Sequence, residues 1–116
     1  MASVDILMIT FRRPEYVRLS LSRLLERCDA KARVWLWHNG DDAETLEVVS
    51  SFSQHPKVHR FHHSPVNVGL RTPTNWLWQE SRADLVSKVD DDCLVDPDWL
   101  AELRAAHAGV PELGVV

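Results

Sequence analysis

The sequence predicts an α/β fold, in which a mostly parallel sheet carries helices on both of its faces. Four short apolar runs alternate along the chain with four amphipathic segments. Strands that alternate with helices in this way pair in parallel, because each helix returns the chain to the end of the sheet at which the preceding strand began. The chain has 116 residues and contains no linker or internal repeat, so we expect residues 1–116 to form one domain.

The first strand and the first helix are predicted from the first 28 residues. Residues 4–10 (VDILMIT) are apolar and rich in branched side chains, which is typical of a buried strand. Pro14 suits the first turn of a helix. Apolar residues then recur at helical spacing, with polar residues on the opposite side, which predicts a helix packed on the sheet. The apolar face consists of Val17, Leu21, Leu24, Leu25 and Cys28.

The next two strands enclose a second helix. Residues 34–37 (VWLW) predict the second strand, and a polar turn follows it. Asp41 and Glu44 have the three-residue spacing of a capping box, which predicts a helix that begins there and ends near Phe52. Residues 57–61 predict a third, weaker strand.

The last part of the chain repeats the alternation. Thr72 and the proline after it predict the start of a third helix. Residues 85–89 predict the fourth strand, and Asp96 with its following proline predicts the start of a fourth helix. Residues 113–116 (LGVV) indicate a fifth strand that the chain hardly completes.

The composition excludes several classes of protein. Hydrophobic residues make up 45% of the chain and charged residues 26%, which excludes a disordered protein. The net charge of −4, without a basic block, argues against nucleic-acid binding. No apolar run approaches the roughly 20 residues of a membrane span, and the N-terminal charges lack the order of a secretory signal. The two cysteines form no C-x-x-C pair, and nothing in the sequence implies an oxidising compartment. Together these observations lead us to expect a cytoplasmic protein.

The acidic run Asp90-Asp91-Asp92 follows the fourth predicted strand. Ligands of parallel α/β sheets bind beyond the carboxyl ends of the strands, so the run stands where function is expected. Three adjacent carboxylates repel one another, and their oxygens suit Mg²⁺ or Mn²⁺. Such a site takes one or two protein carboxylates and completes its coordination with substrate phosphates. A solvated acidic turn is the alternative interpretation, but the position after a buried strand favours a metal.

Basic and imidazole side chains follow the first three strands. Arg12, Arg13 and Arg71 are the cations best placed to meet a diphosphate, although surface arginines are also common without such a role. His38 ends the second strand, where a ligand would touch it, but a lone histidine is more often structural. A further group of histidines does not predict zinc, because strand alternation separates its members and no cysteine joins them. These histidines are His55, His59, His62 and His63.

Four blocks of sequence carry a family resemblance when they are taken together. ILMITFRRPEYVRLSLSRLL resembles an opening strand, a T-Y-N-R-P turn and a first helix, and VWLWHNGDDAETLEVV resembles a second strand, a D-N-G-S turn and a second helix. NVGLRTPTN resembles an N-x-G-x-x-x-A-R-N segment, and VDDDCLVDPDWLAEL resembles a metal-binding D-x-D block with its helix. In this order and spacing, the chain resembles the N-terminal, nucleotide-sugar-binding half of a family 2 glycosyltransferase with the Rossmann-like GT-A fold.

The resemblance implies an enzyme that transfers a sugar from a nucleotide-diphosphate donor, with a UDP-sugar favoured. The metal, Mn²⁺ or Mg²⁺, would neutralise the diphosphate leaving group, and a separate carboxylate would deprotonate the acceptor hydroxyl. The reaction would then be a direct displacement with inversion. Asp92 would be the principal metal ligand, with Asp90 beside it. The donor-binding residues that the resemblance implies are Thr10, Arg12, Arg13, His38, Arg71, Asp90 and Asp91.

The sequence departs from the family pattern at three places. His38 stands where the family has an aspartate that accepts a hydrogen bond from the base, which leaves the identity of the base open. Thr74 replaces the arginine of the A-R-N segment, so Arg71 stands in for it or the contact is lost. Ser87 and Lys88 interrupt a strand that is apolar in the family, which predicts a less buried strand.

A nucleotide-binding module without turnover is the alternative function. A receiver-type domain would need an acidic pair after the first strand, and a dinucleotide-binding enzyme would need G-x-G-x-x-G there; both signals are absent. In the family, the acceptor subdomain and the catalytic carboxylate follow the D-x-D block. We therefore expect the general base to lie outside this chain, and a homodimer or a missing C-terminal partner to complete the site. The acceptor, whether glycan, lipid or small molecule, is left open.

Overall fold

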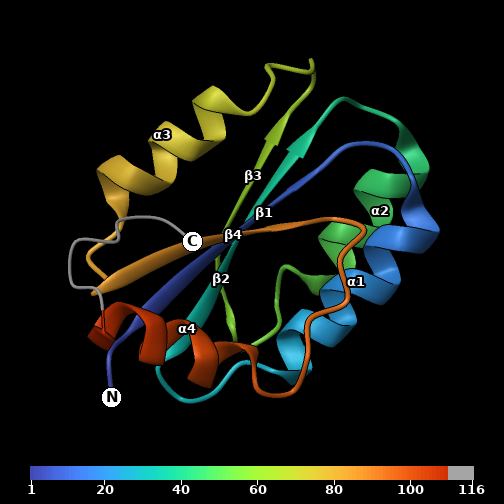
Figure 1. Cartoon of the computed structure of the whole chain (residues 1–116). Coiled ribbons are helices and arrows are strands. Elements are labelled where there is room, and N and C mark those ends of the chain that lie inside the picture. Colours follow the sequence, from blue (N-terminus) through green and yellow to red (C-terminus); the bar gives the residue numbers. More distant parts are fainter. Residues whose placement is uncertain (110–116) are drawn as a thin grey trace.

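A computed structural model describes residues 1–109, in which strands and helices alternate strictly along the chain (Figure 1). Every predicted strand and helix within these residues is present, whereas the fifth strand expected at 113–116 lies outside the described residues. No helix of the described part is long and apolar enough to cross a membrane. The elements are β1 (Val4–Thr10), α1 (Pro14–Glu26), β2 (Ala32–Asn39), α2 (Ala43–Phe52), β3 (Val58–Ser64), α3 (Arg71–Glu80), β4 (Leu85–Asp90) and α4 (Trp99–Gly109).

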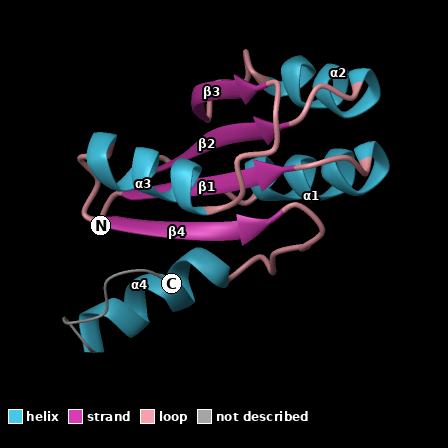
Figure 2. Ribbon diagram, turned by 90° about the horizontal axis from the view of Figure 1, so that it is seen from above, coloured by secondary structure: helices cyan, strands magenta, loops and turns pink. Residues whose placement is uncertain are grey.

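The four strands form one sheet in the order β3-β2-β1-β4, and every neighbouring pair is parallel. Figure 2 shows the four arrows side by side and pointing the same way. The chain moves outward from β1 to β2 and β3, and then returns to place β4 on the other side of β1. This reversal makes a topological switch point between β1 and β4, where open α/β sheets form their ligand crevice. The predicted fold class is confirmed.

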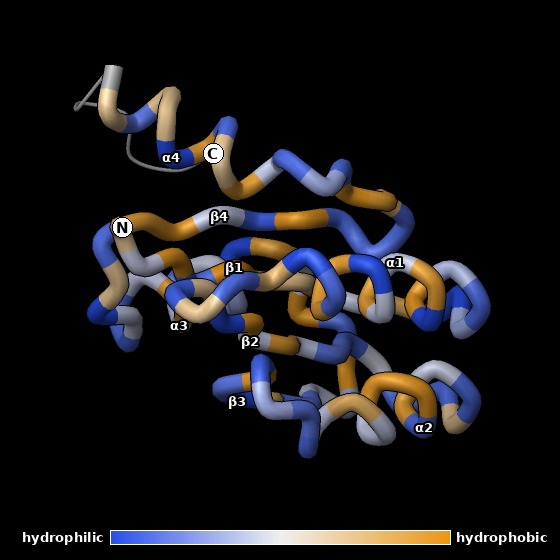
Figure 3. The backbone as a smooth tube through the Cα atoms, turned by 90° about the horizontal axis from the view of Figure 1, so that it is seen from below, coloured by the Kyte–Doolittle hydropathy of each residue, from blue (hydrophilic) through white to orange (hydrophobic). Residues whose placement is uncertain are grey.

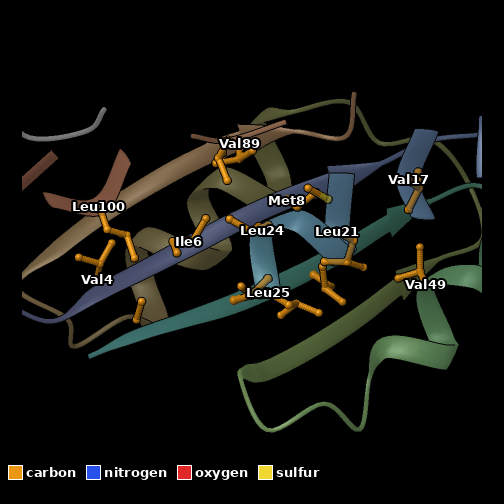
Figure 4. Packing of buried hydrophobic residues seen from close by; sticks show 14 of the residues in the cluster. Val4, Ile6, Met8, Val17, Leu21, Leu24, Leu25, Val49, Val89 and Leu100 are labelled. Carbon is orange, nitrogen blue, oxygen red and sulfur yellow. The ribbon is translucent and has the colours of Figure 1, made fainter. Parts of the chain in front are cut away.

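Helices cover both faces of the sheet and form two separate cores. The larger core joins one face of the sheet to α1, α2 and α4, and Figure 4 shows Leu21 and Leu24 of α1 beside Ile6 and Met8 of β1. The smaller core joins the opposite face to α3. Figure 3 shows hydrophobic residues along β1, whose seven residues are all buried between the two helical layers.

The smaller core is built around aromatic rings. The indoles of Trp35 and Trp76 meet edge to face with centroids 5.1 Å apart, and Trp37 lies 5.5 Å from Trp76. Offset and edge-to-face ring pairs of this kind contribute about 0.5–1.5 kcal/mol beyond the area that they bury. These contacts hold α3 against the sheet.

Strand alternation decides which side chains share a face with α3. On β1, Leu7 and Ile9 point toward α3, whereas Met8 belongs to the opposite core. On β2, Trp35 and Trp37 point toward α3, so the alternation sends His38 to the opposite face and Asn39 to the α3 face. The face that each of these two residues occupies determines its part in the site.

Two helix starts differ from the sequence prediction. The cap of α2 is Asp42, whose Oδ2 accepts a hydrogen bond from the Thr45 amide at 3.3 Å, and not Asp41. The first residue of α3 is Arg71, and the helix has no side-chain cap at Thr72. The following proline lies in the first turn, where its missing N–H leaves no helical hydrogen bond unmade.

The last helix and the last strand also differ in detail. The first residue of α4 is Trp99 rather than the residue after Asp96, because the intervening residues form a turn in which the Trp99 amide donates to the Asp96 carbonyl. On β4, Ser87 is buried and Lys88 is exposed. The predicted weak burial of this strand therefore holds at Lys88 and not at Ser87, and Asp90 at the carboxyl end of the strand is also exposed.

Candidate functional site

A cleft of about 350 Å³ opens at the carboxyl ends of β1, β2 and β4, on the side of the sheet that carries α3. Four separate segments of the chain form its walls, and the switch point of the sheet brings them together. The lining residues are Ile9, Phe11, Arg13, Asn39, Asn67, Gly69, Leu70, Lys88, Val89, Asp90, Asp91 and Asp92.

The turn after β1 has an unusual backbone. Arg12 and Arg13 adopt the left-handed conformation, with φ of 54° and 59°. Non-glycine residues in this region cost of order 1 kcal/mol or more each, and they persist where the surrounding structure holds them. Here the Phe11 amide donates to Asp91 Oδ2 at 3.2 Å. This hydrogen bond ties the turn to the acidic run and directs the Arg13 side chain into the cleft.

The guanidinium of Arg13 lies beside two carboxylates of the acidic run. Its Nη1 is 3.4 Å from Asp92 Oδ2, and its Nη2 is 3.7 Å from Asp91 Oδ1. Because the Arg13 side chain is about half exposed, water screens these contacts, and such pairs contribute less than about 1 kcal/mol. The arginine is therefore held near the carboxylates by contacts that are easily exchanged for others.

The three aspartates have different environments. Asp91 is buried, and this burial raises the pKa of its carboxyl, with the neighbouring charges of Asp92 and Asp90 acting in the same direction against the Phe11 amide and Arg13. Asp90 and Asp92 are exposed on the wall of the cleft. Exposed carboxylates are suitable ligands for a hard divalent cation, so the donor set fits Mg²⁺ or Mn²⁺. Within residues 1–109, no three histidine, cysteine or acidic side chains converge on one point where a metal ion would be held.

Thr10 and His38 occupy a different place from the one expected. They are cross-strand partners at the ends of β1 and β2, and neither has any exposed surface. Thr10 Oγ1 lies 2.8 Å from His38 Nδ1, within hydrogen-bond distance, and His38 Nε2 lies 3.4 Å from an oxygen of Asp42 without a hydrogen bond. Strand alternation turns both side chains away from the cleft. In this structure, therefore, the His38 side chain does not face the cleft in which the sequence predicts its contact with a base.

Burial also sets the charge of His38. It lowers the pKa of the imidazole more than the nearby carboxylate of Asp42 raises it, and the stacked imidazole of His63 acts in the same direction as burial. The ring is therefore neutral at neutral pH. The hydroxyl, imidazole and carboxylate of Thr10, His38 and Asp42 follow one another as in a nucleophilic triad, but the hydroxyl has no exposed surface for a substrate to reach.

The remaining arginines of the prediction lie outside the cleft lining. Arg12 is exposed, and its guanidinium lies 5.0 Å from the centroid of the Phe11 ring. Arg71 is exposed at the first residue of α3. Of the three predicted arginines, the structure thus brings Arg13 together with the acidic run and places the other two at the margin.

The histidines that follow α2 have separate structural contacts. The ring of His62 stacks on Trp37 with centroids 4.1 Å apart, and that of His59 lies 5.3 Å from Trp35. His63 Nε2 donates to the Gly40 carbonyl at 2.7 Å, and the Lys57 amide donates to the remaining ring, that of His55. Each of these rings therefore has its own contact, with an indole ring, a backbone carbonyl or a backbone amide.

The cleft wall also contains eight residues that the sequence prediction did not assign to the site: Ile9, Phe11, Asn39, Asn67, Gly69, Leu70, Lys88 and Val89. The sequence predicts an ordinary turn residue at Asn39, because an Asn-Gly pair favours turns in any protein. The available signal was its place directly after the buried Trp37-His38 pair, at the end of a strand. Strand alternation alone then assigns it to the face opposite His38.

Comparisons with known proteins agree with this geometry. The family model "Glycosyl transferase family 2" matches residues 5–115. A mannosyltransferase from Pyrobaculum calidifontis, solved with GDP-Man and Mn²⁺, superposes with a TM-score of 0.79 at 18% identity over 92% of this chain and 32% of its own. A fragment (1–349) of TarS from S. aureus in complex with UDP-GlcNAc superposes with a TM-score of 0.74 at 18% identity, over 92% of this chain and 31% of the fragment. A search of curated protein sequences found no significant match.

The chain spans about a third or less of these solved proteins. For TarS in its longer form, the matched part is 20% of that chain, at a TM-score of 0.74. Structural likeness at this level of identity shows the fold, and the family match over most of the sequence shows the family.

Proposed function

Because the chain belongs to glycosyl transferase family 2, we propose that residues 1–116 form the donor-binding domain of a glycosyltransferase. The donor is a nucleotide-diphosphate sugar, with a UDP-sugar favoured, and the cofactor is Mn²⁺ or Mg²⁺. The observation that carries this proposal is the cleft at the switch point, where Arg13 and the carboxylates of Asp90 and Asp92 line one space. A diphosphate with a divalent cation has the charges that such a space accommodates.

The cleft residues divide the binding between cation and anion. Asp92, with Asp90, holds the metal, because both carboxylates are exposed on the cleft wall. Asp91 is mostly buried and accepts a hydrogen bond from the Phe11 amide, so it acts mainly by fixing the turn after β1. Arg13 exchanges its screened contacts with the aspartates for phosphate oxygens, to which a guanidinium binds with two parallel hydrogen bonds.

Arg12, Arg71, Thr10 and His38 act around this centre. The two arginines lie at the margin of the cleft, where they attract the donor by charge. The buried Thr10–His38 pair supports the ends of β1 and β2 from the opposite face. In this proposal the buried pair stabilises the sheet and does not contact the donor.

The proposed reaction is a displacement with inversion. The acceptor hydroxyl oxygen forms a bond to the anomeric carbon while the bond from that carbon to the diphosphate breaks. The hydroxyl proton passes to a general base outside this chain, and the nucleoside diphosphate leaves with the electron pair. The divalent cation, when bound, supplies positive charge that stabilises the leaving diphosphate.

Calorimetry with UDP and GDP, each with and without Mn²⁺, tests the donor and metal assignments. We expect the nucleotide to bind the wild-type chain in the presence of Mn²⁺, and the Asp92→Asn variant to lose about tenfold or more in affinity. Asp98→Asn is the matched control, because Asp98 is an exposed aspartate outside the cleft lining. Equal affinities with and without metal, and in all three proteins, would contradict the metal assignment.

A nucleotide-binding module without sugar transfer is the second candidate. Thr74 favours it, because this residue replaces the family arginine and its hydroxyl donates to the Leu70 carbonyl at 2.7 Å within α3. A neutral hydroxyl that is already bonded to its own helix cannot supply the missing positive charge. An assay of sugar transfer with the full-length protein separates the two candidates: nucleotide binding without transfer would favour the module.

The acceptor side of the reaction is assigned to other parts of the assembly. We propose that a homodimer or a C-terminal partner supplies the acceptor site and the general base, and that the protein acts in the cytoplasm. The free thiols of Cys28 and Cys93 are compatible with a reducing compartment. Light scattering of the chain alone measures whether it forms a homodimer, and fractionation of cells measures where the protein is located.

A further inference from the structure

The amide side chain of Asn39 connects the sheet to the loop on the far side of the cleft. Asn39 is the last residue of β2, lines the cleft and has 2% of its surface exposed. Its Nδ2 donates to the Gly69 carbonyl at 3.0 Å, and its Oδ1 accepts from the Val68 amide at 3.3 Å. The same oxygen accepts from the Trp37 indole N–H at 2.9 Å, which fixes the orientation of the amide.

The loop that Asn39 holds forms one wall of the cleft. Residues 67–70, the anchored segment, are exposed, and Asn67, Gly69 and Leu70 line the cleft. Within residues 1–109, the hydrogen bonds that join the anchored segment to the sheet come from Asn39. β1 lies between β2 and β4, so this wall and the acidic run stand on two sides of the cleft.

The chemistry of the anchor requires an amide. One side chain must donate to the Gly69 carbonyl and accept from the Val68 amide at the same time. A carboxylate lacks the donor, and an alkyl group lacks both functions. The anchored segment also contains Gly69 at φ +79°, a conformation that favours glycine. Because glycine has no side chain, no side-chain contact can hold the backbone in place at this residue. Its position therefore depends on bonds to its backbone.

We propose that Asn39 is a positioning residue for the nucleotide donor: its amide fixes the anchored segment as a wall of the cleft at the distance that the donor requires. This proposal rests on the proposed function and adds a residue to it. The donor contacts the wall, and Asn39 acts through that wall. Loss of the amide widens the cleft on this side and lowers the affinity for the nucleotide, while the sheet and both cores remain folded.

Three variants test the proposal. Asn39→Ala removes all three hydrogen bonds, and we expect about tenfold weaker binding of UDP or GDP with Mn²⁺. Faster hydrogen exchange of the Val68 amide, which donates to Asn39 Oδ1, is expected in the same variant without nucleotide. Asn75→Ala is the control, because Asn75 is an exposed asparagine on α3 outside the cleft lining, so the affinity of this variant should stay within about twofold of wild type.

Asn39→Asp supplies the chemical rescue. Its carboxylate keeps the acceptor for the Val68 amide but repels the Gly69 carbonyl, and protonation restores an O–H donor. Because burial raises the pKa of a carboxyl, the loss of affinity relative to wild type should shrink as the pH falls from about 7.5 to about 5. Titration with the neutral nucleosides uridine and guanosine separates this effect from direct repulsion between the new carboxylate and a diphosphate, because wall displacement weakens both ligand types.

The outcomes are distinguishable from those for the proposed function. A wild-type chain that binds neither nucleotide would overturn the proposed function together with this inference. A wild-type chain that binds, with folded Asn39→Ala and Asn39→Asp variants that bind equally well and exchange the Val68 amide at the same rate, would overturn the positioning role alone. If Asn39→Ala does not fold, Asn39→Asp carries the test by its pH profile.

Discussion

Replacement of Thr10 by valine tests whether the buried hydroxyl–imidazole pair stabilises the sheet or contacts the ligand. Valine keeps the branched shape of threonine and removes its Oγ1, which lies 2.8 Å from His38 Nδ1. Both residues have no exposed surface, so water cannot replace the lost partner. The other ring nitrogen of His38 already lacks a hydrogen bond, and the variant therefore leaves the whole buried imidazole unpaired.

The expected cost follows from this burial. An unpaired buried polar group costs about 1–3 kcal/mol, and the methyl group that is gained returns less than about 1 kcal/mol. We expect Thr10→Val to lower the free energy of unfolding by about 1–2 kcal/mol, and the melting temperature by roughly 4–8 °C. Because the pair faces away from the cleft, the affinity of the folded variant for nucleotide should stay near that of wild type.

Urea and thermal unfolding followed by circular dichroism give the stability, and calorimetry gives the affinity. The double variant Thr10→Val/His38→Leu is the control, because two apolar partners leave no unpaired group, and it should be less destabilised than the sum of the single variants. A stability change below about 0.5 kcal/mol would refute the buried hydrogen bond. A loss of affinity above about tenfold in a folded variant would refute the orientation of Thr10 away from the ligand.

Three further predictions concern pH and the attachment of α4. Burial lowers the pKa of His38, so the unfolded chain binds more protons than the folded one, and stability should fall as the pH drops below about 6.5; a His38→Gln variant should show a shallower dependence of its urea midpoint. Burial raises the pKa of Asp91, so the contribution of this carboxyl to stability should decline as the pH rises above about 4. The Asp91→Asn variant should then melt higher than wild type at neutral pH, with no advantage near pH 4. Arg104 of α4 donates to both carboxylate oxygens of Asp29 and, at 2.9 Å, to the Ala2 carbonyl. We therefore expect Arg104→Ala to lower the free energy of unfolding in urea by about 1.5–3 kcal/mol. The control Arg82→Ala, at an exposed position, should change it by less than about 0.5 kcal/mol.

The secondary structure of this protein is largely encoded in local sequence. The apolar run 4–10 and the helical face that begins at Val17 are visible without tertiary information, because burial of a strand or of one helix face imposes its period on neighbouring residues. Helix starts are less certain from sequence, since several residues compete for one cap. At α2 the N-cap residue is Asp42, whose side chain accepts a hydrogen bond from the Thr45 amide.

Part of the site also follows from sequence. Residues that end parallel strands meet at one edge, so the acidic run and Arg13 were expected near one another, and the structure places Arg13 Nη1 3.4 Å from Asp92 Oδ2. The sequence could not determine how the three aspartates differ. Burial of Asp91 and exposure of its neighbours depend on the turn after β1, which belongs to a distant part of the chain.

The sequence by itself determined the alternating elements, the parallel sheet and the strand ends that bear charge. Only the tertiary structure decided which face of β2 carries each polar residue. Helices cover both faces of this strand, so its residues from Val34 to Asn39 are all buried and show no alternation of apolar and polar side chains. Without that alternation the sequence cannot distinguish the two faces, and a shift of one residue exchanges them. Only the structure therefore shows that His38 is buried on the face opposite the cleft, while Asn39 lines the cleft and holds its wall.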